Sequence, residues 1–118
     1  MKKLFWLAAF ASVALIPGLS QTPGGDAANG KRLFLRDGCY ECHGYAGQGG
    51  RDGARISTIA LTPQALIRYV RAPVGAMPAY TDKVITDREL TDIHAYLQTI
   101  PKAKPAKDIP LLNDLLKK

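Results

Sequence analysis

The five residues from Cys39 to His43, Cys-Tyr-Glu-Cys-His, constrain this chain more than any other stretch. Two intervening residues put Cys39 and Cys42 about one helical turn apart, so both sulfurs can reach one edge of a flat ring. His43 follows directly, and its imidazole can turn toward a metal at the centre of that ring. A C-x-x-C-H run is the attachment signature of a c-type haem. The run therefore predicts one covalent haem c, bonded through Cys39 and Cys42, with His43 as an axial iron ligand.

Two other interpretations of the cysteine pair fit less well. A redox-active dithiol usually sits in a βαβ unit, and the sequence has no pattern of that kind. A closed zinc site needs about four ligands. The chain has only two cysteines and, besides His43, one further histidine, His94.

The N-terminal residues have the pattern of a secretory signal. Two lysines precede an apolar run from Leu4 to Ile16, and small residues follow it up to Ser20. This predicts a signal peptide over residues 1–20 and a periplasmic mature protein. A retained anchor is the alternative, but a spanning helix takes about 20 apolar residues, so we expect no stable membrane span after cleavage. Export agrees with the cysteine chemistry, because an uncommitted pair in an oxidising compartment would be expected to form a disulfide.

Residues 21–101 are long enough for one small domain. Much of the apolar surface that such a domain buries can belong to the haem, so we expect the haem-free chain to be largely unfolded. The whole chain has a net charge of +6. A surplus this small fits either attraction to an acidic partner or an ordinary solvated surface. No dense basic cluster interleaved with aromatic residues is present, which argues against a nucleic-acid partner.

Three segments have the apolar periodicity of amphipathic helices. The first follows the capping residue Asp26 and is predicted to end near residues 37–38, just before the cysteine pair. The second covers residues 61–72 and has a threonine cap followed by proline. The third begins at a capping box formed by Thr86 and Glu89. The chain is therefore predicted to be mainly helical.

Glycine marks two places where the chain must pack closely. Gly30, inside the first predicted helix, indicates a close crossing with another helix, where Tyr96 would fill the missing side chain's space; a tolerated surface glycine is the alternative. Residues 44–56 contain five glycines within ten positions. Such a stretch suits a loop whose backbone packs against a flat ligand.

Met77 is the predicted second axial ligand. It is the only methionine apart from Met1, and it lies in a non-helical stretch before Pro78. A thioether is a soft ligand that favours reduced iron. A core methionine that fills a gap is the alternative. The rival ligand, His94, lies beside the apolar stripe of the last predicted helix and is expected to be a partly exposed surface histidine.

Residues 102–118 have a different composition. A basic, proline-containing linker leads into a tail that is rich in aliphatic side chains. The tail could fold back over its own domain or dock on a partner, and the sequence leaves both open. The candidate docking residues are Ile109, Leu111, Leu112, Leu115 and Leu116.

Residues 26–100 resemble a class I monohaem cytochrome c of the small bacterial type. The resemblance rests on the C-x-x-C-H motif and on the order of the features around it: Gly30, Phe34, the glycine loop, Met77-Pro78 and Tyr96-Leu97. It implies an all-α fold of three to four helices around one covalently attached haem. It also implies His43 and Met77 as axial ligands, and a crossing of the first and last helices.

The sequence departs from this family at one point. Many members have a Gly-Pro pair after the glycine loop, whose carbonyl accepts the proton of the axial histidine, whereas this chain has Gly53-Ala54. Because any backbone carbonyl can accept that proton, Ala54 or a neighbour is expected to orient His43. Arg55 is a candidate partner for a haem propionate.

The resemblance implies a carrier of single electrons between redox protein partners, such as a dehydrogenase donor and a cytochrome or oxidase acceptor. It would be a free shuttle or the haem subunit of a periplasmic dehydrogenase, and the electron would leave near Tyr40, Tyr45 and Met77. No acid/base pair or activated nucleophile is apparent, so we expect no enzymatic activity. The alternative is a haem-based gas sensor or peroxidase with an open iron position, which requires that Met77 does not bind iron.

Overall fold

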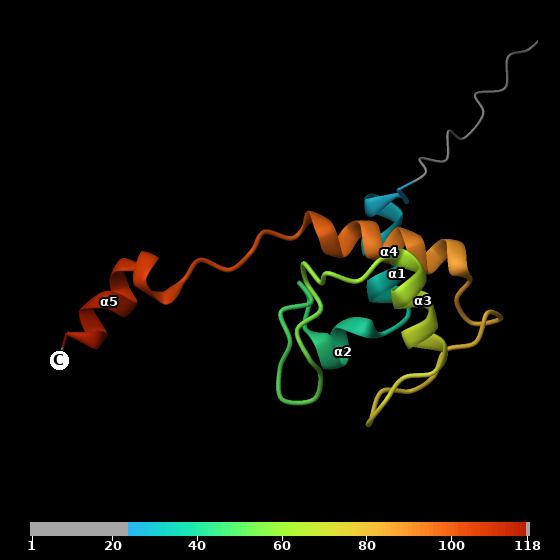
Figure 1. The fold of residues 1–118 in the computed structure, drawn as a ribbon, viewed down its shortest axis with the longest axis horizontal. Helices are drawn as coiled ribbons and strands as arrows, with labels where there is room; N and C mark the ends of the chain where they lie inside the picture. Colours follow the sequence, from blue (N-terminus) through green and yellow to red (C-terminus); the bar gives the residue numbers. More distant parts are fainter. Residues whose placement is uncertain (1–23, 118) are drawn as a thin grey trace, which may run out of the picture.

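A computed structural model describes residues 24–117, so the predicted signal peptide lies outside the described residues. These residues form five α-helices and one 3-10 turn, and no strand occurs among them (Figure 1). The expected all-α fold is confirmed. The elements are α1 (Ala27–Arg36), α2 (Cys39–His43), α3 (Pro63–Arg71), α4 (Asp87–Thr99), η1 (Ala106–Asp108) and α5 (Pro110–Leu116).

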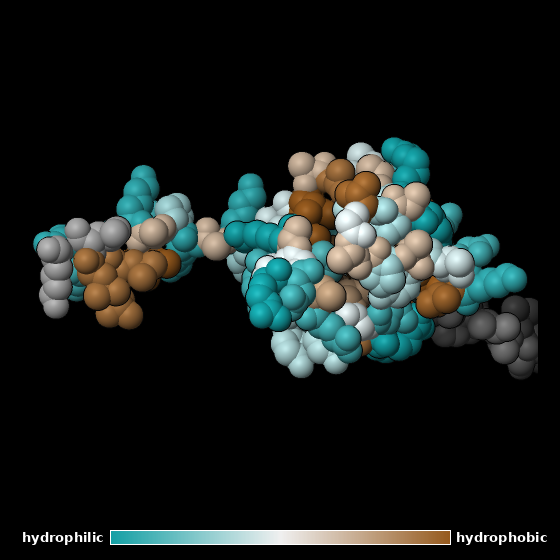
Figure 2. Space-filling model, turned by 90° about the horizontal axis from the view of Figure 1, so that it is seen from below, coloured by the Kyte–Doolittle hydropathy of each residue, from teal (hydrophilic) through white to brown (hydrophobic). Residues whose placement is uncertain are grey.

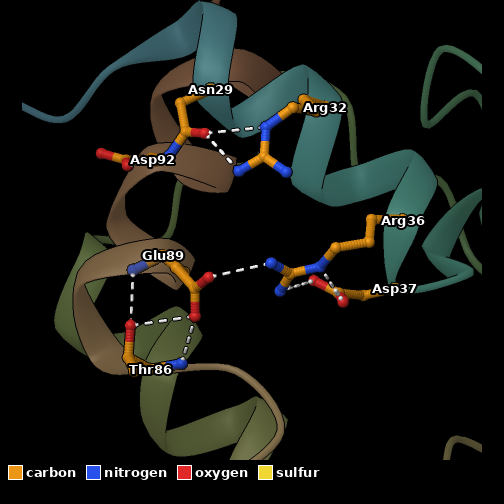
Figure 3. Close-up of polar contacts among 7 residues, drawn as sticks. All are labelled: Asn29, Arg32, Arg36, Asp37, Thr86, Glu89 and Asp92. Atoms are coloured by element: carbon orange, nitrogen blue, oxygen red, sulfur yellow. Dashed lines mark hydrogen bonds and ion pairs between the residues drawn. The ribbon is translucent and has the colours of Figure 1, made fainter.

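Local capping signals set the helix starts. The Asp26 carboxylate accepts the backbone N–H groups of Ala28 and Asn29 at the start of α1. At the start of α4, Thr86 and Glu89 form the predicted capping box, which Figure 3 shows closed by reciprocal hydrogen bonds. Each cap supplies acceptors to N–H groups that have no partner within their own helix.

Helices α1 and α4 cross at Gly30. A Cβ atom on Gly30 would lie 1.9 Å from the backbone oxygen of Asp92, so only glycine fits there. The predicted close crossing is confirmed, but the expected partner was wrong. The backbone of Asp92 occupies the space, and Tyr96 packs one turn farther along against Phe34, with ring centroids 5.6 Å apart. Two backbones that touch leave no room for an aromatic ring between them.

The crossing also buries a carboxylate. Asp92 accepts the backbone N–H of Asp26 and the side-chain amide of Asn29, both at 2.8 Å, and pairs with Arg88 at 3.5 Å. Figure 3 shows Asn29 and Asp92 facing each other between α1 and α4. The apolar pattern of α4 gave no signal for this residue, because its hydrogen-bond partners Asp26 and Asn29 lie more than 60 positions away in the sequence.

The core lies between α1, α3, α4 and the loop before α4. Most of the apolar residues along the three predicted amphipathic helices are buried, while Ile67 and Ile100 are partly buried against them. Ile85, which the periodicity does not predict because it lies outside a helix, is also buried. The buried hydrophobic residues are Leu33, Phe34, Leu66, Val70, Ile85, Leu90, Ile93, Tyr96 and Leu97.

The C-terminal tail leaves this core. Among the described elements, α5 packs only against η1, and Figure 1 shows both standing away from the helices of the domain. The tail therefore does not fold back over its own domain. Its apolar side lies open to solvent, as Figure 2 shows, with Leu111 71% and Leu115 61% exposed. Within residues 24–117 the structure contains no helix with the length and apolar character needed to cross a bilayer.

Candidate haem site

The cysteine pair lies on the short helix α2. This helix begins after Gly38 and ends before Gly44, both of which have positive φ angles that favour glycine. The thiols of Cys39 and Cys42 are free, Cys39 being partly buried and Cys42 exposed. The helix therefore presents two unpaired sulfurs three residues apart, as attachment to one edge of a ring requires.

His43 has one ring nitrogen fixed by the backbone. Its Nδ1 lies 2.7 Å from the carbonyl oxygen of Ala54. Because a carbonyl can only accept, Nδ1 must carry the proton, which leaves the lone pair of Nε2 free for a metal. Ala54 thus takes the role that the sequence assigned to it or a neighbour.

The glycine loop packs its backbone along α2. The N–H of Gly49 donates to the carbonyl of His43 at 2.8 Å, and the carbonyl of Gly47 accepts the N–H groups of Ile56 and Ser57, also at 2.8 Å. A Cβ on Gly53 would lie 2.6 Å from the carbonyl oxygen of Cys42. The backbone of the loop therefore lies against the end of α2, closer at position 53 than a residue with a Cβ would permit.

Two tyrosines border the cysteine helix. The rings of Tyr40 and Tyr45 stack with centroids 4.7 Å apart, and Tyr45 is 70% exposed. The hydroxyl of Tyr96 donates to the carbonyl of Tyr45 at 3.1 Å, which ties α4 to the start of the glycine loop. The edge beside the motif is therefore aromatic, open to solvent and held in place.

Met77 lies in the loop between α3 and α4, partly buried against the core. The hydroxyl of Tyr80 donates to the carbonyl of Asp37 at 3.3 Å, two residues before Cys39. This contact places the loop that carries Met77 beside the start of the cysteine helix. The structure thus brings together the two segments from which the predicted ligands come.

His94 has a partner elsewhere. Its Nε2 lies 2.7 Å from the carbonyl of Leu61, just before α3, and the residue is partly exposed. The expectation of a partly exposed surface histidine is confirmed, and this nitrogen is used in a contact between α4 and the start of α3. Arg55 is exposed, and its Nε donates to the hydroxyl of Ser57 at 3.1 Å. Its suggested role toward a propionate stays a prediction.

Burial makes the Cys39 thiol a weaker acid than an ordinary cysteine. Loss of solvent, and next the negative charge of Asp37, raise the pKa of its thiol from 9.0 to about 11. Burial also raises the pKa of Tyr80, with the neighbouring Cys39 and Asp37 adding to the effect. Without haem, the Cys39 sulfur would stay protonated and neutral at pH 7. A neutral sulfur in apolar surroundings suits a position against the edge of an apolar ring.

A family model described as cytochrome c oxidase, cbb3-type, subunit III matches residues 25–97. The chain belongs to this family. It is a c-type monohaem cytochrome, which confirms the resemblance drawn from its motifs. Searches of curated proteins and of solved structures found no match. The cytochrome is thus a haem-based electron-transfer protein, and its family implies haem c and redox partners.

The side chains of the cytochrome fit such a haem. They offer two free thiols on one helical turn, an imidazole whose Nε2 is left available, and closely packed backbone beside them. Sequence reasoning found the cysteines and His43 through the motif, and the closely packed loop through its glycines. It missed Tyr80 and Arg71, which hold the Met77 loop of the cytochrome. Their contacts join residues that no local pattern relates.

Proposed function

We propose that this cytochrome is an exported carrier that passes single electrons between redox partners through a His/Met-ligated haem. In this proposal Cys39 and Cys42 form the thioether bonds, His43 and Met77 are the axial ligands, and the protein has no enzymatic activity. The observation that carries it is the contact of His43 Nδ1 with the Ala54 carbonyl, which leaves Nε2 for iron. A bound haem supplies the one-electron couple of its iron.

The residues of the chain have separate tasks in this mechanism. The carbonyl of Ala54 keeps His43 in one tautomer and one orientation, and hydrogen bonding of this kind raises the basicity of the ligand. Met77 supplies a soft sulfur that stabilises the reduced state and raises the potential. Tyr45, which is exposed and stacks on the partly buried Tyr40, offers a partner an aromatic surface beside the thioether edge. No step requires a proton donor or a nucleophile.

The visible spectrum tests the ligand set. We expect low-spin ferric and ferrous spectra that carbon monoxide does not change, because Met77 would fill the sixth position. High-spin character with ready carbon monoxide binding would favour the alternative, a gas sensor or peroxidase with an open iron position. Met77→Ala should convert the first behaviour into the second while the haem stays covalently attached.

The C-terminal tail supports a more specific role in docking. Residues 102–118 hold five lysines and two aspartates, whereas residues 24–101 hold nine basic and eight acidic residues. The tail therefore concentrates positive charge on a chain whose haem domain is almost neutral. Leu111, Leu112 and Leu115 are exposed on α5, and the side chain of Leu116 lies outside the described part of the structure. Ile109 is partly buried beside them.

The occupant of this surface is proposed to be a periplasmic redox protein with an apolar groove and an acidic rim. A two-turn helix is marginal in water, so its leucines need a surface that covers them. The haem domain carries too little net charge to attract the tail, and a second tail would repel it. The family description names an oxidase subunit, so an oxidase is one candidate acceptor beside a dehydrogenase donor.

Removing residues 102–118 from the holoprotein tests the docking role. Reduction by the physiological donor should slow and lose its dependence on salt, because both the leucines and the lysines are gone. Reduction by ascorbate, which needs no docking, serves as the control and should not change. An unchanged rate of reduction by the donor would contradict docking through the tail and favour a freely diffusing shuttle.

A further inference from the structure

The last residue of α3, Arg71, spans the base of the loop that carries Met77. Its Nη1 donates to the carbonyl of Tyr80 at 2.9 Å, and its Nη2 donates to the carbonyl of Ile85 at 2.8 Å. Nη2 also pairs with the carboxylate of Asp87, the first residue of α4, at 2.5 Å. The side chain is only 23% exposed. One planar guanidinium thus joins the end of α3 to three points on the return of the chain into α4.

Tyr80 is held at every polar group it has. Its N–H donates to the carbonyl of Val70 at 3.1 Å, its carbonyl accepts from Arg71, and its hydroxyl reaches the carbonyl of Asp37. Ile85, the second residue that Arg71 holds, is 2% exposed in the core. The second half of the loop, from Tyr80 onward, is therefore a fixed base.

The first half of the loop lacks such support. In the described part of the chain, residues 73–79 make no backbone-to-backbone hydrogen bond, although Ala72 and Tyr80 at either side each donate one. Gly75 has a positive φ, and a Cβ placed there would meet nothing within 4 Å. Met77 packs against the core three residues before Tyr80, on a span of the described chain that no backbone hydrogen bond holds between its two ends.

A second set of contacts fixes the start of α4, where the loop ends. Arg36 of α1 binds Glu89 at 3.1 Å and Asp37 at 2.7 Å, and Glu89 closes the capping box with Thr86, as Figure 3 shows. Asp37 is also the residue whose carbonyl receives the Tyr80 hydroxyl. These contacts tie the base of the Met77 loop to the residues that precede Cys39. Arg71, together with the hydrogen bond from the Tyr80 N–H to the Val70 carbonyl, links that base to α3.

We propose that Arg71 is a positioning residue for Met77, clamping the ends of residues 72–86 so that the methionine sulfur is presented to iron. This inference rests on the proposed His/Met ligation. The reason is entropic: a loop whose ends are already fixed loses less freedom when the sulfur binds. Without the clamp, the sulfur leaves iron more often, and an added ligand competes with it more easily.

Imidazole binding to the ferric holoprotein measures this competition. The iron–sulfur bond to Met77 breaks and an iron–nitrogen bond to imidazole forms, without a change in the oxidation state of iron. In Arg71→Gln, we expect imidazole to bind about tenfold more tightly, the ratio that corresponds to losing one charge-assisted hydrogen bond. Arg71→Lys should lie between, since a lysine keeps the charge but cannot fork to several acceptors.

Arg68 offers a matched control. It lies on the same helix about one turn earlier, is exposed, and has no hydrogen bond or ion pair to another described side chain. Arg68→Gln should leave the affinity for imidazole at the wild-type value. The urea midpoint of each variant is measured beside it. A purely structural role for Arg71 would lower the midpoint without changing imidazole affinity in the absence of urea.

Met77→Ala separates this proposal from the one on which it rests. If wild-type protein binds imidazole as tightly as Met77→Ala, Met77 is not a ligand and the ligand set itself is wrong. If Met77→Ala binds more tightly but Arg71→Gln matches the wild type, the ligand is correct and the clamp is refuted. Should Arg71→Gln fail to retain haem, Arg71→Lys and Asp87→Asn decide between the same two outcomes, because each removes only part of the clamp.

Discussion

The two sides from which ligands approach the proposed haem are built differently. On the side of His43, short hydrogen bonds from Gly49 to His43 and from His43 to Ala54 join backbone segments that nearly touch. On the side of Met77, residues 73–79 make no backbone hydrogen bond among the described residues. Met77 itself packs against the core, but hydrogen bonds hold only the ends of the loop. One proposed ligand is thus fixed by its immediate surroundings, and the other mainly by contacts made several residues away.

The two sides should therefore differ in how easily the proposed ligand can change position. A ligand held by adjacent backbone can change position only if α2 or the glycine loop unfolds. A ligand on an unsupported span can leave and return while the helices keep their packing. We therefore expect substitutions on the His43 side to lower the stability of the whole holoprotein. Substitutions on the Met77 side should mainly change the occupancy of the sixth position of iron.

Replacing each proposed ligand with alanine should show the largest contrast between the two sides. His43→Ala should lower the unfolding free energy of the holoprotein by about 3 kcal/mol or more, because haem binding, α2 and the glycine loop lose their common anchor. Met77→Ala should cost less than half of that and mainly open the iron to carbon monoxide. Urea unfolding and carbon monoxide difference spectra measure the two effects. Equal losses of stability would contradict the comparison.

Two glycines provide a smaller and cleaner contrast. Alanine at Gly53 would place its Cβ 2.6 Å from the carbonyl oxygen of Cys42, so we expect a loss of about 2 kcal/mol as the backbone shifts. Alanine at Gly75 would meet open space, and only its positive φ would cost about 1 kcal/mol. Both variants are compared by urea unfolding of the holoprotein. A larger loss at Gly75 would mean that the Met77 side is the more tightly packed one.

The acid response should come partly from the base of the Met77 loop. Hydrogen bonding from the Thr86 N–H, and also the contact with Arg36, lower the pKa of Glu89 below its usual 4.5. A lowered folded pKa stabilises the protein above the unfolded pKa, and this contribution is lost as the pH falls through the folded pKa. Glu89→Gln should therefore cost about 0.5 kcal/mol at pH 7, a value kept small because the group is partly exposed. At pH 3 the difference from wild type should be smaller.

The smallest expected change in stability is that of proline at position 54, on the His43 side. The N–H of Ala54 makes no recorded hydrogen bond within residues 24–117, and the preceding glycine has no Cβ to clash with the ring. We expect Ala54→Pro to raise the unfolding free energy by about 0.5 kcal/mol, through a less flexible unfolded chain. A decrease would show that the φ angle at this residue does not suit proline.

Local signals explain which parts of the fold could be predicted. Asp26 and the Thr86 capping box mark helix starts because a cap acts within three residues. The apolar periodicity predicted most of the core for the same reason. Asp92, by contrast, looks like a surface residue until α1 crosses it, and the tail was expected to be apolar but not to form the helix α5.

In the candidate site, too, residues in local motifs could be predicted and long-range contacts could not. The motif identified Cys39, Cys42 and His43 because the chemistry of attachment fixes their spacing. Met77 was chosen for its uniqueness and stays a prediction. The contacts of Arg71 and Tyr80 join segments that are separate in sequence, and only the folded chain brings them together. The carbonyl that meets His43 could be predicted only as that of Ala54 or a neighbour, from the place of the family's Gly-Pro pair, and the structure identifies Ala54.

The lack of hydrogen bonds in residues 73–79 also has a consequence in time. Unprotected loops move in about nanoseconds to microseconds, whereas hydrogen-bonded amides exchange with solvent only on opening events that are far slower. Deuterium should enter this stretch almost at once and reach the amides of Ile56 and Ser57, both bonded to Gly47, much later. A redox partner would then meet a protein surface that is mobile beside Met77 and fixed beside His43.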